Sequence, residues 1–259
     1  MELGLSDKTA LVTGSHRGTG AIIASRLIDE GATVLVHGFT RDEAERACET
    51  IGGGRPVHGD IATATGTEQL LSNCAAAPPI DILVNNYGTV GAGRWDDTDE
   101  AAWLDMYQRN VLSAQRLIQR LLPGMRQRRW GRVINLGTVG STRPAARMPH
   151  YYASKGALAT LTVSLAKEVA GTGITVNLVS PGLIHTAEVE ASYLAQGRRN
   201  GWGETWAEIE PRVAADIPIG RIVRREEVAD LVAFLASPRA DAIHGQNIRI
   251  DGGALGVLT

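Results

Sequence analysis

"KTALVTGSHRGTGAIIASRLIDEG", residues 8–31, joins two segments of different periodicity through a glycine-rich turn. Its first six residues are an apolar run typical of a buried strand, and its last twelve have the apolar spacing of a helix. Gly14 permits a tight turn, Gly18 lets a ligand approach the backbone, and Gly20 lets the helix pack against the strand. Because the amides at the start of a helix attract anions, the segment predicts a dinucleotide-binding turn.

The same alternation of short apolar runs and longer amphipathic stretches continues along the chain. It predicts βαβ units with right-handed crossovers, and therefore an α/β fold. We expect a Rossmann-type, doubly wound parallel sheet of about seven strands with helices on both faces. After the first strand and helix, strands are expected at 32–38, 55–60, 80–86, 131–137, 173–180 and 245–253, and helices at 41–51, 65–76, 99–122 and 150–170. Pro123 is expected to stop the third of these helices.

The domain organisation predicted is one NAD(P)-binding domain over residues 1–259, because nothing resembles a linker or a repeat. Residues 182–224 have little strand signal, and a stretch of this length predicts a substrate-binding lid or small subdomain. Trp202 and Trp206 in it either pack the stretch onto the body or line a substrate pocket.

Composition excludes several function classes. A net charge of −2 argues against nucleic acid as the partner. The basic run at 125–132 is expected to cap a helix end and face water. With no signal-peptide core and no long apolar run, and with Cys48 and Cys74 as free thiols, we expect a cytoplasmic protein without membrane contact. The six histidines show no ligand spacing, so no metal is expected.

Further motifs follow the glycine turn in a fixed order. They are "NNYG" (85–88), Tyr151-x-x-x-Lys155, "SPGLIHT" (180–186) and the tail "GQNIRIDGG" (245–253). With the Gly-x-x-x-Gly-x-Gly spacing of the turn, the chain resembles the short-chain dehydrogenase/reductase family, and in particular its 3-oxoacyl-carrier-protein reductase-like members. The resemblance extends from Lys8 to Gly253.

Two tyrosines precede Lys155, and either phenol could contact it. On a helix that advances 100° per residue, Tyr151 lies about 40° from Lys155 and Tyr152 about 60° the other way, so spacing favours Tyr151 only slightly. The resemblance assigns the pairing to Tyr151 as proton donor and acceptor. A phenol with a pKa near ~10 needs activation at neutral pH, and a neighbouring ammonium would lower that pKa. By resemblance, Lys155 also hydrogen-bonds the nicotinamide ribose.

Two further catalytic residues are implied by the resemblance. Thr138 stands where similar proteins have a serine that holds the substrate oxygen. The hydroxyl is retained, but the added methyl group stiffens the side chain. Ser141 is a less favoured substitute. Asn110 matches an asparagine that holds a water in the proton relay. The expected catalytic set is Asn110, Thr138, Tyr151 and Lys155.

The cofactor-binding residues expected from the motifs extend along much of the chain. They are Gly14, Ser15, Arg17, Gly18, Thr19, Gly20, Arg41, Asp60, Ile61, Asn86, Tyr87, Gly88, Tyr151, Lys155, Pro181, Gly182, Ile184 and Thr186. Tyr87 is a departure, since similar proteins usually have alanine at that position.

The cofactor expected is NADP(H), with NAD(H) possible. An NAD enzyme commonly places a carboxylate beyond the second strand, and Gly38 stands there instead. Arg17 and Arg41 can both supply a guanidinium for a 2′-phosphate. Phe39 argues the other way, because many similar NADP enzymes have an arginine in its place.

The predicted function is hydride transfer between NADP(H) and a carbonyl/secondary alcohol substrate. The alternative is a nucleotide-binding sensor or scaffold that lost turnover, which the complete catalytic set argues against. An epimerase or dehydratase is disfavoured by the lack of a sugar-binding domain after Gly253. By resemblance we expect a homo-oligomer, a tetramer built through the helices at about 100–122 and 150–170 and the last strand.

Overall fold

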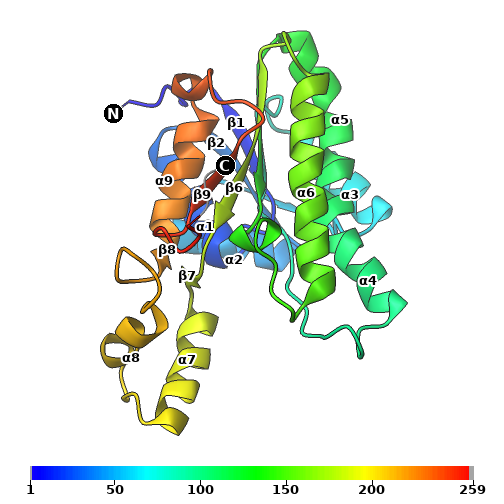
Figure 1. Cartoon of the computed structure of the whole chain (residues 1–259). Helices are drawn as coiled ribbons and strands as arrows, with labels where there is room; N and C mark the ends of the chain where they lie inside the picture. Colours follow the sequence, from blue (N-terminus) through cyan, green and yellow to red (C-terminus); the bar gives the residue numbers. More distant parts are fainter. Residues whose placement is uncertain (1, 257–259) are drawn as a thin grey trace.

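The computed structural model describes residues 2–256, and a parallel sheet of seven strands forms its centre (Figure 1). The strand order is β3-β2-β1-β4-β5-β6-β9, and every neighbouring pair runs parallel. The expected doubly wound fold is therefore confirmed. The strands are β1 (Thr9–Val12), β2 (Thr33–Gly38), β3 (Arg55–His58), β4 (Ile82–Asn85), β5 (Gly131–Leu136), β6 (Ile174–Pro181) and β9 (Asn247–Ile250).

Helices cover both faces of the sheet because its strands are apolar on both sides. On one face, α1 (Gly18–Asp29) and α9 (Arg225–Ala236) pack side by side, and α2 (Arg41–Ile51) joins them. On the other face lie α3 (Ala64–Cys74), α5 (Ser113–Arg128) and α6 (Pro149–Glu168).

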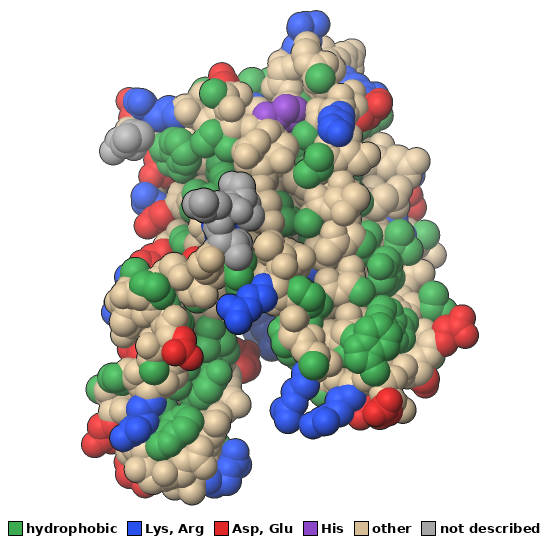
Figure 2. Space-filling view, viewed as in Figure 1, with side chains coloured by type: hydrophobic (Ala, Val, Ile, Leu, Met, Phe, Trp, Pro, Cys, Tyr) green, Lys and Arg blue, Asp and Glu red, His purple; other side chains and the backbone are tan. Residues whose placement is uncertain are grey.

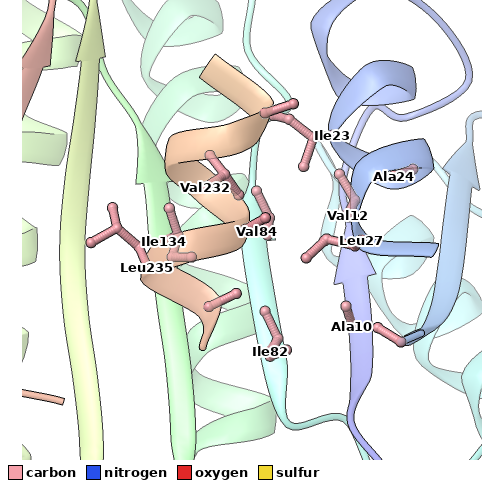
Figure 3. Close-up of a cluster of buried hydrophobic side chains, with 14 of the residues drawn as sticks. Ala10, Val12, Ile23, Ala24, Leu27, Ile82, Val84, Ile134, Val232 and Leu235 are labelled. Carbon is pink, nitrogen blue, oxygen red and sulfur yellow. The ribbon is translucent and has the colours of Figure 1, made fainter. Parts of the chain in front are cut away.

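Successive strand residues point to opposite faces, so each strand contributes to two hydrophobic cores. In the first core, Ile23 of α1 and Val232 of α9 pack over Val12 and Val84 (Figure 3). The neighbouring Leu11 belongs to the second core, beneath α3, α5 and α6. These two cores bring the carboxyl ends of the strands to one edge of the sheet.

The long helix expected at 99–122 differs from the prediction in two ways. It consists of α4 (Glu100–Tyr107), a π-helical turn η1 (Gln108–Leu112) and α5, which continues past Pro123 to Arg128. The predicted stop at Pro123 was wrong. A proline removes only its own N–H bond, and on a surface helix the freed carbonyl can turn toward water. The helix ends at Arg129, whose left-handed backbone has φ of 53°.

The basic run at 125–132 is divided between two environments. Arg126 and Arg128 lie in the last turn of α5, where cations favour a helix end, as expected. Arg132 does not face water: its side chain is 1% exposed, lies 4.3 Å from the ring centre of Trp130 and pairs with Asp241. Because it sits in β5, the sheet buries it.

Residues 182–224 form an arm that projects beyond the sheet (Figure 1). It holds α7 (Ala187–Asn200) and α8 (Trp206–Val213), and two short parallel strands, β7 (Ile184–His185) and β8 (Val223–Arg224), join it to the body. Across residues 2–256, no helix has the length and apolar character to cross a bilayer.

Alanine substitutions at two helical glycines should have opposite effects on the free energy of unfolding. A Cβ on Gly66 of α3 would lie 2.1 Å from the carbonyl oxygen of Asp60, whereas a Cβ on Gly156 of α6 would meet no atom within 4 Å. Gly66→Ala should lower the free energy of unfolding by about 2 kcal/mol or more, as overpacking does. Gly156→Ala, the control, should leave it unchanged or raise it by up to ~1 kcal/mol. Guanidinium denaturation measures both, and equal effects would contradict the steric account.

Candidate active site

The predicted site residues follow the carboxyl ends of the strands at the point where the strand order reverses. Strand β1 lies between β2 and β4, so the connections after β1 and β4 diverge and leave a crevice above the sheet. On the outer surface, a deep notch separates the α7–α8 arm from the body, and Lys and Arg side chains lie at its upper end and along the rim formed by the body (Figure 2).

Lys155 carries a buried ammonium group at the edge of the sheet where the carboxyl ends of the strands lie. The side chain comes from α6, the residue is 5% exposed, and Nζ donates a 2.7 Å hydrogen bond to the carbonyl oxygen of Leu136 at the end of β5. Burial lowers the pKa of Lys155 to about 8. Gly88 is required beside it, because a Cβ there would lie 3.0 Å from Nζ and 2.7 Å from Oδ1 of Asn110.

Tyr151 and Tyr152 lie one turn before Lys155 on α6, in different surroundings. Burial raises the pKa of Tyr151 to about 12, although a hydrogen bond with Thr138 acts in the opposite direction. The expected lowering by Lys155 is absent from this arrangement, because Nζ is directed to Leu136 and burial dominates. The Tyr152 ring lies 5.3 Å from that of Tyr151 and covers Gly140, where a Cβ would be 2.0 Å from Cε1 of Tyr152.

Thr138 lies two residues after the end of β5, on an extended backbone that leads into a short 3₁₀ turn. Its Oγ1 accepts a 3.2 Å hydrogen bond from the amide of Gly140. The hydroxyl of Ser141 donates to the carbonyl oxygen of Thr138 at 2.7 Å. Since the Ser141 hydroxyl is committed to the backbone, Thr138 is the better placed of the two hydroxyls.

Asn110 lies in the π turn η1, a feature that is frequent at functional sites. Its Oδ1 accepts from the amide of Thr89 at 2.8 Å, and its Nδ2 donates to the Thr89 carbonyl at 2.9 Å and to Oγ of Ser154 at 3.0 Å. Ser154 in turn donates to the carbonyl of Tyr151 at 2.7 Å. The amide of Asn110 therefore fastens the loop after β4 to the start of α6.

A buried polar chain beneath the site was missed by the sequence analysis. Nδ2 of Asn85 donates to Oδ1 of Asn135, and Nδ2 of Asn135 donates to Oγ1 of Thr162, both at 2.8 Å. The chain connects β4, β5 and α6, and so fixes the height of α6 on the sheet. Each asparagine interrupts an otherwise apolar strand, which was the available signal, because a buried amide needs partners.

The glycine turn has the shape that a dinucleotide phosphate requires. Gly20 packs closely, since a Cβ there would lie 2.4 Å from Nδ2 of Asn86. Gly18 has φ of 61° and nothing within 4 Å of a Cβ, so its outer side is open beside the start of α1. Ser15 is fully buried, and its hydroxyl donates to the Val12 carbonyl, so its side chain is directed into the protein and not toward a ligand.

The side chains at the adenosine end are aromatic and charged. The rings of Phe39 and Tyr87 meet edge to face, with centres 5.2 Å apart. The guanidinium of Arg17 lies 3.9 Å from Glu188 of α7, and that of Arg41 lies 2.7 Å from Glu45. The two predicted guanidiniums are thus paired with different carboxylates.

Other predicted cofactor residues stand at strand ends or helix starts. Thr19 lies in the first turn of α1, Asp60 accepts from the amide of Ala62 at 3.1 Å, and Ile61 is buried. Pro181 ends β6, and Gly182 packs against Asp251.

The last two predicted cofactor residues, Ile184 and Thr186, lie where the chain passes from the site into the arm. Ile184 lies in β7, and Oγ1 of Thr186 accepts from the amide of Val189 at the start of α7. The ring of Trp206 stacks on that of His185, with ring centres 4.8 Å apart, and this contact packs α8 against β7. Both residues also line a cavity of about 360 Å³, so Trp206 packs the arm and lines a cavity at once. Among residues 2–256, no group of three or more potential metal ligands occurs.

Known proteins resemble the chain over nearly its whole length. The family model described as enoyl-(acyl carrier protein) reductase matches residues 14–254. An uncharacterised oxidoreductase of Bacillus subtilis, YvaG, is 35% identical over 98% of both chains. The 3-oxoacyl-[acyl-carrier-protein] reductase FabG of Escherichia coli is 34% identical over 95% of this chain and 96% of its own.

Solved structures agree with this assignment. L-sorbose reductase from Gluconobacter frateurii, complexed with NADPH and L-sorbose, superposes with a TM-score of 0.92 at 32% identity over the full length of both chains. A gluconate 5-dehydrogenase from Burkholderia cenocepacia, in complex with NADP and tartrate, gives 0.86 at 26% identity, over 99% of this chain and 98% of its own. The chain belongs to the short-chain dehydrogenase/reductase family and is an NAD(P)-dependent oxidoreductase.

Proposed function

We propose that the chain reduces a small ketone, or oxidises the matching secondary alcohol, with NADP(H) as hydride carrier. The observation that carries the proposal is that α6 places two groups at the carboxyl end of β5: the phenol of Tyr151, which hydrogen-bonds to Thr138, and the ammonium of Lys155, which donates to Leu136. Two hydroxyls and one buried ammonium there form a hydrogen-bonding site for a carbonyl oxygen, next to a glycine turn that is open to a dinucleotide.

A bound NADPH supplies the hydride that converts the carbonyl carbon to an alcohol carbon. Thr138 holds the carbonyl oxygen through its hydroxyl, and the phenol of Tyr151 donates the proton that this oxygen requires. Burial raises the pKa of Tyr151, and the ammonium of Lys155, which donates to Leu136 while the phenol is neutral, offsets this by attracting the phenolate once it forms. Asn110 and Ser154 hold the backbone of Tyr151 in place for this transfer.

NADP(H) is favoured over NAD(H) by two observations. The related sorbose reductase and gluconate 5-dehydrogenase were solved with NADPH and NADP, respectively. The last residue of β2 is Gly38, so no carboxylate side chain at that position repels a 2′-phosphate. Arg17, at the mouth of the glycine turn, is 76% exposed and paired only at 3.9 Å, which leaves it able to turn toward that phosphate.

A non-catalytic nucleotide sensor is the second candidate function. A sensor needs the glycine turn but not the ammonium of Lys155, which is taken out of water and has one carbonyl partner in the structure. Keeping such a group has a free-energy cost that catalysis explains and nucleotide binding alone does not. The complete set of hydroxyls and ammonium therefore favours the enzyme.

The substrate class we propose is a small polyhydroxylated ketone. The relatives with solved structures include proteins named for sorbose and gluconate. The cavity between the arm and the start of α9 combines the stacked ring of Trp206 with polar and charged groups, among them His185, Glu210 and Arg224, a mixture that suits sugar hydroxyls. Thr138, Tyr151 and Lys155 do not line it, so the proposal rests chiefly on the related structures. A panel of keto-sugars, keto-acids and acyl thioesters, followed by NADPH absorbance, tests this class.

We further propose a homotetramer in the cytoplasm. Ile118 and Leu122 of α5 and Leu161 and Leu165 of α6 line an apolar depression, and Val163 beside it is 43% exposed. An exposed apolar surface along two long helices is typical of a subunit interface. Both cysteines are free thiols, which fits a reducing compartment.

Substitution of the two tyrosines separates their roles. Tyr151→Phe should abolish most turnover while NADPH still binds, because the ring remains and only the proton is lost. Tyr152→Phe, the matched control, should have a mild effect, because its ring packs on Gly140. Steady-state kinetics together with NADPH titration measures both. An active Tyr151→Phe enzyme beside an inactive Tyr152→Phe enzyme would reverse the assignment.

The hydroxyl of Thr138 can be tested without changing the fold. Thr138→Ser should retain activity, and Thr138→Ala should lower kcat roughly 10²-fold or more, as loss of an oxyanion donor does. The serine variant controls for the methyl group. An alanine variant with unchanged kcat would show that the hydroxyl takes no part in the reaction.

Cofactor preference is measured by kcat/KM with NADPH and with NADH. We expect a clear preference for NADPH, and Arg17→Ala should weaken NADPH binding while leaving NADH binding nearly unchanged, because only NADPH has the 2′-phosphate. Arg46→Ala on the outside of α2 serves as a charge-matched control. A preference for NADH, or an Arg17→Ala variant with unaltered NADPH affinity, would refute the assignment.

A further inference from the structure

We infer that His37 is the positioning residue that sets the glycine turn for cofactor binding. The inference rests on the proposed NADP(H) function but concerns a residue outside all the motifs. His37 lies in β2, is fully buried, and belongs to the strand that faces the turn. None of the motifs that led to the site contains it.

The imidazole of His37 bridges two segments that flank the cofactor. Its Nδ1 accepts a 2.9 Å hydrogen bond from the amide of Gly14, the first glycine of the turn. Its Nε2 lies 2.9 Å from the carbonyl oxygen of Gly59, directly before Asp60. An amide can only donate and a carbonyl can only accept, so these partners fix the neutral tautomer with the proton on Nε2.

The backbone of His37 is tied to the same turn. Its amide donates to Oγ of Ser15 at 2.8 Å, and its carbonyl accepts from the amide of His16 at 3.1 Å. Three successive residues of the turn are therefore bonded to one residue of β2. Without the imidazole, the amide of Gly14 would lose its buried acceptor, and the turn would have to move to find another.

The surroundings keep the imidazole neutral, as this role requires. Burial lowers the pKa of His37 to about 4, with His16 lowering it further and Asp60 and Glu43 acting in the opposite direction. A protonated ring would have no acceptor for Gly14, so the bond to the turn persists through the neutral pH range. The ring is thus a fixed spacer between the phosphate end and the adenine end of the cleft.

Two amide substitutions can separate the two hydrogen bonds of His37. Oδ1 of an asparagine reaches the place of Nδ1, so His37→Asn keeps an acceptor for Gly14 and loses the link to Gly59. His37→Gln reaches the place of Nε2 and does the reverse. Both variants lose the ring and differ from each other by one buried methylene, so the melting temperature of each cofactor-free variant is measured alongside as the control for packing.

NADPH fluorescence titration of the two variants tests the inference. We expect His37→Gln to raise the Kd for NADPH about tenfold, equivalent to about 1.4 kcal/mol, and His37→Asn to stay within about threefold of the wild type. In turnover, His37→Gln should raise KM for NADPH with little change in kcat. Equal Kd values in both variants, with only the melting temperature lowered, would reduce His37 to a packing residue and overturn the inference.

A measurement on the unsubstituted protein covers the case in which a variant does not fold. His244 also accepts from an amide at Nδ1 and faces a carbonyl oxygen with Nε2, so NMR of ¹⁵N-labelled histidine should show two imidazoles that keep the Nε2–H tautomer at pH 6. Only one of the two, His37, should have an Nδ1 resonance that shifts when NADPH is added. An Nδ1–H tautomer, or an Nδ1 resonance indifferent to the cofactor, would overturn the inference. Wild-type protein that binds NADPH but turns over no substrate would instead refute the proposed function.

Discussion

The ammonium of Lys155 donates its hydrogen bond to the carbonyl oxygen of Leu136, and this contact joins α6 to the end of β5 deep inside the site. Because the lysine is buried, the neighbouring residues must leave space for its side chain and supply hydrogen-bond acceptors for its ammonium group. Gly88 has no side chain where a Cβ would crowd Nζ. Burial lowers the pKa of Lys155 to about 8, so the group can lose its charge near neutral pH unless a negative partner forms. A phenolate at Tyr151 is such a partner.

Tyr151 and Lys155 can act on the same substrate only if α6 keeps a fixed position along the sheet. The chain from Asn85 through Asn135 to Thr162 lies below the site and crosses from β4 to β5 to α6. Asn110 and Ser154 make a second connection, from the π turn to the first turn of α6. Directional hydrogen bonds between buried amides specify one arrangement, whereas an apolar contact would allow sliding. Catalytic geometry therefore depends on polar contacts that take no part in the reaction.

The parts of the molecule that sequence could predict are those with local signals. Strand and helix periodicities predicted the parallel sheet, and the glycine spacing predicted the open turn at Gly18. What the sequence could not provide was long-range pairing: the partners of His37 and Asn135 are distant along the chain. The predicted helix end at Pro123 was wrong because a surface helix tolerates the lost hydrogen bond. The predicted exposure of Arg132 was wrong because its position in a central strand buries the side chain, although the surrounding run of residues is basic. The pKa of Tyr151 was misjudged as well, because burial depends on the fold and not on the spacing to Lys155.

The acidity of Tyr151 in the NADP⁺ complex is the most direct measure of whether Lys155 activates the phenol. Tyrosinate absorbance can be titrated in the complex and compared with the same titration of Tyr151→Phe, which removes one phenol and leaves the other four tyrosines of the chain. If Lys155 stabilises the phenolate, one phenol should ionise well below ~10 in the wild-type complex and be missing from the variant. A Tyr151 that still ionises near 12 with NADP⁺ bound, as burial alone dictates, would contradict the mechanism.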